Sequence, residues 1–317
     1  MSRVAVVGAG AWGTALAVQA ARVGHDVVLW ARDPAPIWAA RASPRLPGVT
    51  LPDRVEVVGA LPGPGFDIVL LAVPVQHLGA VAAGLRTDAP LLACAKGVEA
   101  GTGRLPLELL SALHPGHPAA VLSGPNFAHE VATGLPAAAV VAAGDASLRA
   151  HLAGLLAGPA FRLYGSADPV GVQLGGAAKN VIAIAAGAVI GAGLGENARA
   201  ALVTRGLAEL GRLVAAGGGR AETAAGLSGL GDLLLTCTGS ASRNFSLGLA
   251  LGCGERLADA LAGQRGATEG VATASALVAR AAGVELPICA AVAALLEGRV
   301  DLPGAITSLM SRPPRDE

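Results

Sequence analysis

Lysine is almost absent from this chain of 317 residues. Of the 23 lysines and arginines, only Lys96 and Lys179 are lysines, which leaves 23 − 2 = 21 arginines. Arginine does not deprotonate in proteins, whereas lysine gives up its proton when its surroundings disfavour charge. The two lysines therefore mark positions where a guanidinium would not serve, unless they were retained by chance. Asparagine is also rare, and its four residues lie in glycine-rich or motif-like segments: Asn126, Asn180, Asn197 and Asn244.

An excess of charge is missing as well, because the net charge is +0 and the pI is near 7.0. This balance argues against a general attraction to nucleic acid or to an anionic membrane. The four cysteines have no CxxC pair, and the six histidines show no metal-ligand spacing, so we expect no metal site. No secretory signal opens the sequence, and isolated thiols suit a reducing compartment, which together predict a cytoplasmic protein.

The length allows two domains with sizeable cores. Short apolar runs in the first half predict buried strands: Val4–Val7, Val27–Trp30, Asp67–Val73, Leu91–Ala95, Ala119–Ser123, Ala137–Ala142 and Phe161–Tyr164. From Gly175 onward helical patterns dominate: Lys179–Ala192, Ala198–Ala216, Leu257–Ala262, Thr273–Ala282 and Pro287–Glu297. We therefore predict an α/β protein, with a Rossmann-type doubly wound parallel sheet at residues 1–170 and an all-helical substrate-binding domain at residues 171–317.

A glycine-rich loop follows the first predicted strand. Gly8, Gly10 and Gly13 form a GxGxxG pattern, with Ala11 and Trp12 inside it, and a helical pattern follows. In this context Gly8 permits a tight turn, Gly10 lets backbone N–H groups approach a pyrophosphate, and Gly13 lets the helix pack on the strand. The loop predicts a dinucleotide site at a helix N-terminus; a turn without a ligand is the alternative.

The residues after the second predicted strand bear on which dinucleotide is bound. An NAD-preferring site usually has an acidic residue there for the ribose hydroxyls. Here Arg32 precedes Asp33, and Asp33 also suits the start of a turn before Pro34. Arg32 would bind a 2′-phosphate, so NADP(H) is favoured and NAD(H) remains the alternative.

Polar or flexible residues follow two later strands, at Lys96-Gly97 and at Gly124-Pro125-Asn126-Phe127-Ala128. Ligands in open α/β sheets bind beyond the carboxyl ends of the strands. We therefore expect Lys96 to converge with Gly124–Ala128 near the nicotinamide; an ordinary surface lysine is the alternative.

The stretch Gly175–Asn180 is expected to open a long helix, with Lys179 near its head. Small residues spaced four apart would form one stripe on which another backbone can pack closely: Ala183, Gly187, Gly191 and Gly195. The apolar run looks too short and too glycine-rich for a membrane span, so we predict a buried core helix. A helix N-terminus and a dry core both disfavour a charged ammonium, which favours Lys179 as a proton acceptor.

Two further segments suggest ligand contacts. Asp232, beside two glycines, would orient a lysine or cap a helix beginning at Leu233. Ser242, Arg243 and Asn244 together present a hydroxyl, a bidentate fork and an amide, a suitable set for a phosphate or carboxylate.

These residues together identify a family. The chain resembles bacterial NAD(P)-dependent glycerol-3-phosphate dehydrogenases along nearly its whole length. The matching motifs are GAGAWGTALA (Gly8–Ala17), AVP (Ala72–Pro74), AKG (Ala95–Gly97), SGPNFA (Ser123–Ala128), GGAAKN (Gly175–Asn180), GLGD (Gly229–Asp232) and TCTGSASRNF (Thr236–Phe245).

The resemblance implies roles for individual residues. Lys179 would be the proton acceptor in the interconversion of sn-glycerol 3-phosphate and dihydroxyacetone phosphate, a reaction that feeds glycerophospholipid synthesis. The implied substrate-binding residues are Lys96, Gly124, Asn126, Asp232, Ser242, Arg243 and Asn244. Besides the glycine loop, the implied cofactor contacts are Trp12, Arg32, Lys96, Ala128, Arg243 and Glu269.

The chain departs from the family pattern at two positions. Asn126 stands where the family often has Ser or Thr, and Gln173 where it often has an acidic residue. Asn126 keeps hydrogen-bonding groups, so a substrate contact there is still expected.

Two other functions and the oligomeric state remain open at this point. A β-hydroxyacid dehydrogenase would share the glycine loop and a lysine but prefer a carboxylate to a phosphate. A non-catalytic NAD(P)H sensor would have no need of Lys179, Asp232 and Arg243 together. A homodimer is one alternative for the oligomeric state.

Overall fold

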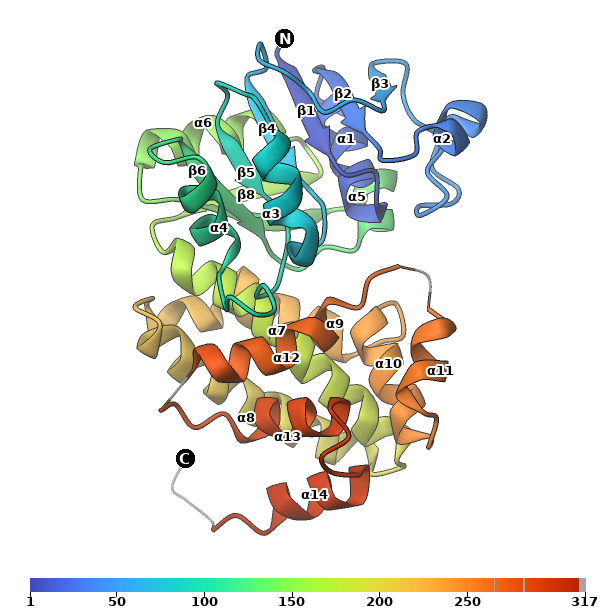
Figure 1. Cartoon of the computed structure of the whole chain (residues 1–317), viewed down its shortest axis with the longest axis vertical. Helices are drawn as coiled ribbons and strands as arrows, with labels where there is room; N and C mark the ends of the chain where they lie inside the picture. Colours follow the sequence, from blue (N-terminus) through green and yellow to red (C-terminus); the bar gives the residue numbers. More distant parts are fainter. Residues whose placement is uncertain (265, 282, 314–317) are drawn as a thin grey trace. The chain divides into compact units, whose positions relative to one another are not determined.

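The computed structural model describes residues 1–264, 266–281 and 283–313, and Figure 1 labels their helices and strands. The chain forms two compact units. Met1–Lys96 and Arg104–Gln173 make the first, and Gly97–Gly103 joins the chain from Leu174 onward to make the second. Two hydrogen bonds hold Gly97–Gly103 within the second unit. The Val98 N–H donates to Thr273 Oγ1 (3.4 Å), and Arg280 Nη1 donates to the Gly103 carbonyl (2.9 Å).

An eight-stranded sheet organises the first unit, in the order β3-β2-β1-β4-β5-β6-β7-β8. All neighbouring strands are parallel except β6 and β7, which pair antiparallel. The strands are β1 (Arg3–Val7), β2 (Asp26–Trp30), β3 (Val55–Val58), β4 (Ile68–Leu71), β5 (Leu91–Ala93), β6 (Ala119–Ser123), β7 (Ala137–Ala142) and β8 (Phe161–Ser166). The predicted doubly wound sheet is confirmed, with a last strand pair that runs opposite to the rest.

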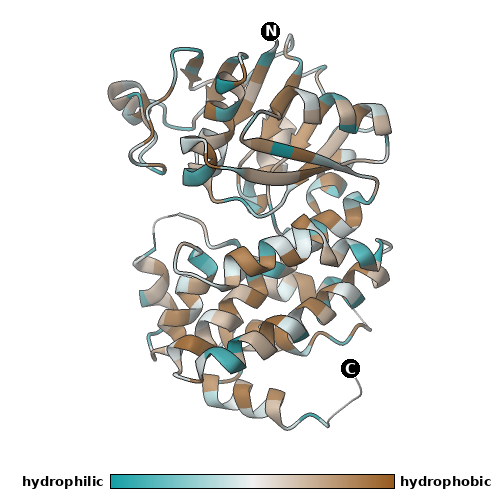
Figure 2. Cartoon of the chain, turned by 180° about the vertical axis from the view of Figure 1, so that it is seen from behind, coloured by the Kyte–Doolittle hydropathy of each residue, from teal (hydrophilic) through white to brown (hydrophobic). Residues whose placement is uncertain are grey.

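Both faces of this sheet are buried, as the uninterrupted apolar runs indicated. Along β1, Val4 and Val6 belong to one core, whereas Ala5 and Val7 belong to another. Several strands of the sheet are accordingly brown in the hydropathy colouring of Figure 2. The first core also contains α1 (Ala11–Arg22), α5 (Ala128–Thr133) and α6 (Ala146–Leu156). The second contains α3 (Val75–Gly84) and α4 (Pro106–Leu113).

The segment 34–64, which we predicted as Pro- and Gly-rich connections, is more ordered than that. It contains α2 (Ala35–Ala40) and strand β3, and between them a loop whose Leu46, Val49 and Leu51 are buried in the first core. The apolar residues of this segment are separated by prolines, so they formed no recognisable strand or helix pattern in the sequence.

The regular elements in the described part of the second unit are all helices. They form α8 (Gly195–Ala216), a 3₁₀ turn (Ala221–Ala225), a π turn (Leu227–Gly231), α9 (Asp232–Cys237), α10 (Arg243–Gly252), α11 (Leu257–Ala262), α12 (Glu269–Arg280), α13 (Pro287–Leu296) and α14 (Leu302–Met310). The all-helical prediction is confirmed; α9 was expected only as an alternative, as a helix beginning at Leu233, and α10 and α14 were missed. Ala282, at the end of the predicted helix Thr273–Ala282, lies outside the described residues.

The longest helix is α7 (Pro169–Gly191), and it begins earlier than the sequence suggested. The glycine pair that appeared to open it lies inside it, and Gly195 belongs to α8 instead. Among the described residues α7 is the one helix long and apolar enough to cross a membrane, so the prediction that it is too short is wrong. However, 89% of its apolar window is buried inside the protein, as expected of a core helix.

The stripe of small residues on α7 is confirmed at Gly187 and Gly191, where α10 packs. A Cβ on Gly187 would lie 2.0 Å from the Phe245 carbonyl oxygen, and one on Gly191 would lie 2.2 Å from that of Leu249. On the facing helix, a Cβ on Gly248 would lie 1.9 Å from the Ile184 carbonyl oxygen. Only glycine permits this approach of two backbones, so the stripe determines how closely α10 packs on α7.

Candidate active site

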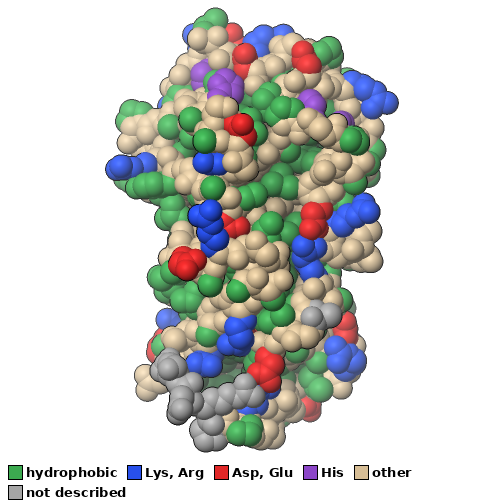
Figure 3. All heavy atoms as spheres, turned by 90° about the vertical axis from the view of Figure 1, so that its left-hand side faces the viewer, with side chains coloured by type: hydrophobic (Ala, Val, Ile, Leu, Met, Phe, Trp, Pro, Cys, Tyr) green, Lys and Arg blue, Asp and Glu red, His purple; other side chains and the backbone are tan. Residues whose placement is uncertain are grey.

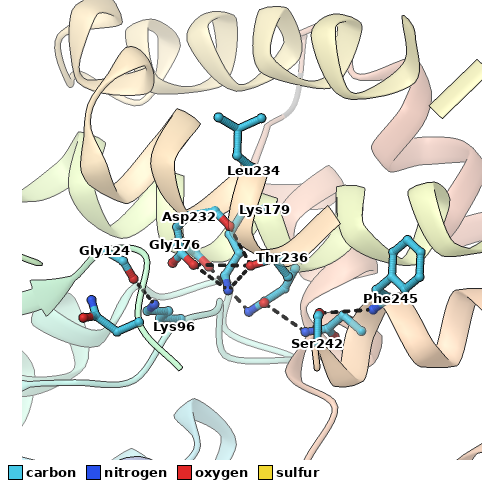
Figure 4. A network of polar contacts seen from close by, with 12 residues as sticks. Lys96, Gly124, Gly176, Lys179, Asp232, Leu234, Thr236, Ser242 and Phe245 are labelled. Atoms are coloured by element: carbon cyan, nitrogen blue, oxygen red, sulfur yellow. Dashed lines mark hydrogen bonds and ion pairs between the residues drawn. The ribbon is translucent and has the colours of Figure 1, made fainter. Parts of the chain in front are cut away.

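The centre of the second unit's polar cluster is Lys179, which is only 8% exposed. Its Nζ lies 3.1 Å from Asp232 Oδ1 and donates a hydrogen bond of 2.9 Å to Thr236 Oγ1 (Figure 4). Asp232 is 1% exposed and Thr236 3%. The Thr236 hydroxyl in turn donates to the Asp232 carbonyl (2.6 Å), one turn earlier on α9. The predicted pairing of Asp232 with a lysine is thus present, and Asp232 is itself the first residue of α9.

A π turn lies immediately before α9, so it sets the position of Asp232, the first residue of that helix. In Leu227–Gly231 the Gly231 N–H donates to the carbonyl five residues back, at Gly226 (3.1 Å). Such turns are rare and concentrate at functional sites. Gly229 is required here, because a Cβ would lie 2.0 Å from the Ala224 carbonyl oxygen. The Gly-Leu-Ser-Gly-Leu-Gly run before Asp232 is therefore a compact support rather than a flexible loop.

The expected environment of Lys179 needs a correction. Lys179 is the eleventh residue of α7, so it lies far from the positive end of the helix dipole. The buried carboxylate of Asp232 also stabilises the ammonium, whereas the helix terminus was expected to destabilise it. Burial is confirmed, but Lys179 is paired with a buried carboxylate, a partner that the sequence analysis left as one of two alternatives for Asp232.

Ser242, Arg243 and Asn244 stand at the start of α10. The Ser242 hydroxyl oxygen accepts from the Phe245 N–H (3.2 Å) and so caps the helix. Asn244 Nδ2 donates to Asn180 Oδ1 (2.9 Å), and Asn244 Oδ1 accepts from the Gly270 N–H (3.0 Å). Asn244 therefore ties α10 to α7 and α12, whereas Ser242 caps α10 itself. Arg243 is exposed, and its guanidinium makes no hydrogen bond or ion pair with the residues that the structure describes.

The side-chain contact of Asn244 with the Gly270 N–H also locates Glu269. Gly270 follows Glu269 directly, so the first residues of α10 and α12 lie side by side. Glu269 is half-buried at the start of α12. The predicted cofactor contacts Arg243 and Glu269 thus belong to one neighbourhood.

In the first unit the glycine loop has the geometry of a dinucleotide site. Gly8 has φ +117, and a Cβ on it would lie 2.9 Å from the Ala72 backbone; one on Gly13 would lie 1.9 Å from the Gly8 carbonyl oxygen. A Cβ on Gly10 would meet nothing within 4 Å, so its surface stays open for a ligand. Trp12 Nε1 is buried without a partner in the described chain, which leaves a donor available beside the loop. These features fit a bound pyrophosphate.

Arg32 and Asp33 follow β2 and are both exposed. Asp33 Oδ1 accepts from the Ala35 N–H (3.3 Å), so it begins the turn into α2, as predicted. Within the described residues the Arg32 guanidinium makes no hydrogen bond or ion pair and is available to an anion.

Lys96 and Gly124 converge at the carboxyl ends of the adjacent strands β5 and β6, as predicted. Lys96 Nζ donates to the Gly124 carbonyl (2.8 Å; Figure 4). Gly124 has φ +140, and a Cβ on it would lie 2.9 Å from Ala139 Cα. Asn126 Nδ2 donates to the Ala138 carbonyl (3.1 Å), while its Oδ1 is buried without a partner among the described residues. That oxygen can accept a hydrogen bond from a ligand.

Ala128 starts α5, which packs along α1. Arg22, in the last turn of α1, donates to the Val131 carbonyl (3.0 Å) near the end of α5. Ala128 and Trp12, at the starts of α5 and α1, pack against the same core. The predicted cofactor residues Ala128 and Trp12 are thus placed on one side of the sheet.

Comparisons with known proteins decide the family. Residues 3–149 match the profile of the NAD-dependent glycerol-3-phosphate dehydrogenase N-terminus, and residues 168–307 match that of its C-terminus. A glycerol-3-phosphate dehydrogenase [NAD(P)+] from Acidiphilium cryptum is 56% identical over 319 residues, covering 99% of this chain and 98% of the relative. The chain belongs to the NAD-dependent glycerol-3-phosphate dehydrogenase family.

Other members agree with this assignment. The Gluconobacter oxydans enzyme of the same name is 53% identical over 99% of this chain and 98% of its own. The crystal structure of glycerol-3-phosphate dehydrogenase from Coxiella burnetii superposes with a TM-score of 0.93 at 36% identity, over 98% of this chain and 99% of that one.

The sequence alone did not identify two residues that make buried or part-buried hydrogen bonds in the structure, Thr236 and Gln173. Thr236 was noted only as part of a motif, because a threonine one turn after an aspartate carries no distinctive signal. Gln173, noted only as a departure, uses both ends of its amide: Oε1 accepts from the Leu107 N–H (2.8 Å) and Nε2 donates to the Pro169 carbonyl (2.8 Å). An ionised carboxylate would not supply that second bond.

The four cysteines are free. Burial raises the pKa of the Cys237 thiol, which directly follows Thr236, to about 12. This thiol is therefore not a nucleophile in the Lys179 cluster. The described residues contain no group of three or more His, Cys, Asp or Glu side chains suited to a metal ion. On the face drawn in Figure 3, acidic and basic side chains are interspersed, in line with the net charge of +0.

Proposed function

We propose that this protein interconverts sn-glycerol 3-phosphate and dihydroxyacetone phosphate with NAD(P)(H). The observation that carries the proposal is the buried Lys179–Asp232–Thr236 cluster. A nicotinamide dinucleotide, when bound, supplies or accepts the hydride at substrate C2. The protein must then supply or accept a proton at the C2 oxygen.

Lys179 is the residue suited to this proton exchange. In the reducing direction its ammonium gives a proton to the C2 oxygen, and in the oxidising direction its neutral amine takes that proton. Asp232 stabilises the cation, and the Thr236 hydroxyl fixes the direction of the Nζ atom. General acid–base catalysis of this kind is typically worth about 10²–10⁴ in rate.

Arg243 is the principal phosphate ligand in this proposal. Its guanidinium is exposed at the start of α10 and offers a bidentate fork. The Ser242 O–H is a second donor, because its oxygen is already used in capping. Asn244 acts mainly by holding Asn180 beside Lys179, which differs from the direct contact that the family resemblance implies.

We assign the remaining substrate and cofactor residues from the family resemblance, supported by the contacts described above. Lys96, held at the Gly124 carbonyl, polarises the substrate carbonyl, and the free Oδ1 of Asn126 accepts from a substrate hydroxyl. Gly8, Gly10, Ala11, Trp12 and Gly13 hold the pyrophosphate. Ala128 and Glu269 line the cofactor site. Arg32 binds the 2′-phosphate of NADP(H), for which we propose a preference over NAD(H).

The product would feed glycerophospholipid synthesis, and we place the reaction in the cytoplasm. Four free cysteines suit a reducing compartment. The interspersed surface charge gives no support to binding of nucleic acid.

The decisive experiment measures oxidation of NADPH by the purified protein with dihydroxyacetone phosphate, with NADH in place of NADPH, and with a 3-keto acid. We expect rapid turnover with dihydroxyacetone phosphate and little with the keto acid. A preference for the keto acid would support a β-hydroxyacid dehydrogenase. Binding of NADPH without turnover of either substrate would support a sensor.

A further inference from the structure

The loop of residues 41–52 is closed at its base by one arginine, and we name it the strap. Arg41 donates to three carbonyls: Nη1 to Val55 (3.1 Å), and Nη2 to Leu51 (3.2 Å) and Pro52 (2.8 Å). The Leu51 N–H donates back to the Arg41 carbonyl (2.7 Å). Its two ends are thus tied together by four hydrogen bonds.

Arg41 holds an unfavourable backbone conformation to do this. Its φ is +47, and it is the one non-glycine residue with a positive φ in the part of the chain that the structure describes. Glycine usually occupies this position after a helix, because a Cβ makes the left-handed conformation unfavourable. Strain of this kind persists where the surroundings enforce it, and it often marks a functional segment.

The strap contacts the glycine loop through Ser43. Ser43 is 1% exposed, and its hydroxyl donates to the Ala9 carbonyl (3.0 Å). The Ser43 oxygen accepts from the Arg45 N–H (3.2 Å), which fixes the direction of the O–H bond. Ala9 lies between Gly8 and Gly10, so this bond reaches the middle of the glycine loop.

Holding the Ala9 carbonyl also orients the next N–H group. A peptide unit is planar and trans, so the Gly10 N–H points opposite to the Ala9 C=O and hence away from Ser43. Gly10 is exposed and caps the start of α1. Within the described residues its N–H makes no hydrogen bond. Without Ser43, the Ala9–Gly10 peptide would rotate more easily, because Gly8 and Gly10 are conformationally permissive.

We propose that Ser43 is a positioning residue for the cofactor: held by the Arg41-closed strap, it fixes the Ala9–Gly10 peptide so that the Gly10 N–H is presented to the pyrophosphate. The inference rests on the proposed function, because it concerns the same dinucleotide site. It adds a residue far from the glycine motif, in a segment with no recognised cofactor pattern.

The test compares ligands that contain a pyrophosphate with one that does not. Binding of NADPH and ADP-ribose, which have a pyrophosphate, and of adenosine 2′-monophosphate, which has none, is measured by calorimetry on the full chain. For Ser43→Ala the dissociation constants of NADPH and ADP-ribose should rise about three- to tenfold, the effect of one hydrogen bond. Binding of adenosine 2′-monophosphate should not change, and kcat at saturating NADPH should stay within about twofold.

Two further variants and a control sharpen the result. Ser43→Thr keeps the hydroxyl and should restore ADP-ribose binding. Arg41→Gly relieves the backbone strain but removes the carbonyl bonds, so it should weaken ADP-ribose selectively. Leu152→Val removes a buried methylene of the same core, on α6, and should lower the melting temperature without changing ADP-ribose affinity.

Unchanged ADP-ribose binding in Ser43→Ala, or equal losses for both classes of ligand, would overturn the inference. If Ser43→Ala does not fold, Arg41→Gly decides in the same way. A wild-type protein that binds neither NADPH nor ADP-ribose would overturn the proposed function itself, which separates the two failures.

Discussion

The Lys179 ammonium and the Asp232 carboxylate form a buried ion pair of 3.1 Å between the middle of α7 and the first residue of α9. Neither group is accessible enough for water to replace its partner, since the side chains are 10% and 1% exposed. Breaking such a pair from one side is costly, because the remaining charge is left buried and unpaired. The pair therefore couples the charge of Lys179 to the position of α9.

Asp232→Asn should change the pH dependence of the reaction. Reduction of dihydroxyacetone phosphate needs the ammonium, so its rate falls as pH rises through the titration of Lys179. Without the carboxylate the ammonium is less stable, so this falling limb should move to lower pH. The measurement is the pH profile of kcat at saturating substrates. Thr236→Val removes a hydroxyl but no charge, so it serves as the control and should lower kcat without moving the limb. A limb in the same place for Asp232→Asn would contradict the coupling.

Arg243→Ala should weaken substrate binding far more than cofactor binding. A charge-assisted hydrogen bond is worth about 1.5–3 kcal/mol, so the KM for dihydroxyacetone phosphate should rise at least tenfold. Dihydroxyacetone, which lacks the phosphate, should be turned over equally slowly by both proteins. Arg256→Ala, which removes an exposed arginine paired with Asp259, is the matched control and should have no effect. An unchanged KM in Arg243→Ala would remove Arg243 from the phosphate site.

Arg32→Ala should reduce or abolish a preference for NADPH over NADH, because Arg32 is assigned to the 2′-phosphate. The comparison is the ratio of kcat/KM for the two cofactors. Arg54→Ala, which removes another arginine of the first unit, should leave the ratio unchanged. If the wild type already prefers NADH, the role of Arg32 is wrong, and Asp33 becomes the better candidate for a ribose contact.

Gly187→Ala tests whether the close packing of α7 and α10 positions the phosphate site. The new Cβ would lie 2.0 Å from the Phe245 carbonyl oxygen, so α10 must move, at a typical cost of about 1–3 kcal/mol. Because α10 begins at Arg243, the KM for dihydroxyacetone phosphate should rise as stability falls. Gly211→Ala on α8 meets nothing within 4 Å and should stabilise the protein by about 0.5–1 kcal/mol instead. Equal melting temperatures for the two variants would contradict this account.

The first unit was predictable where the structure of a segment leaves a signal in neighbouring residues of the sequence. Buried parallel strands are continuous apolar runs, and the glycine loop needs its three glycines within six residues, so both leave local signals. Strand β3 and the strap leave none, because their order depends on Arg41 and Ser43 reaching residues that are distant in the sequence.

The start of α7 was predicted wrongly for a related reason. Glycine usually interrupts helices, so Gly175 appeared to precede one. In the structure Gly175 lies inside α7, where a Cβ would meet the Ser228 carbonyl oxygen at 2.8 Å. That contact comes from a segment more than fifty residues away, and nothing near Gly175 announces it. The position of Lys179 within α7, and its pairing with Asp232, could therefore be learned only from the folded structure.

Lys179→Arg distinguishes a proton-exchanging lysine from one that only supplies charge. Arginine keeps the positive charge and most of the stem, so the ion pair with Asp232 can persist. However, a guanidinium with a pKa above about 12 has no neutral form to offer near neutral pH. Turnover with saturating dihydroxyacetone phosphate should therefore fall by about 10²–10⁴, the usual worth of general acid–base catalysis.

NADPH binding should survive in Lys179→Arg, since the glycine loop belongs to the first unit. Fluorescence titration with NADPH and thermal melting check this alongside turnover. Lys96→Arg is the matched comparison, because Lys96 is assigned to polarising the carbonyl rather than to carrying the proton, and it should lose much less activity. Turnover of Lys179→Arg within a few-fold of wild type would rule out proton exchange by Lys179.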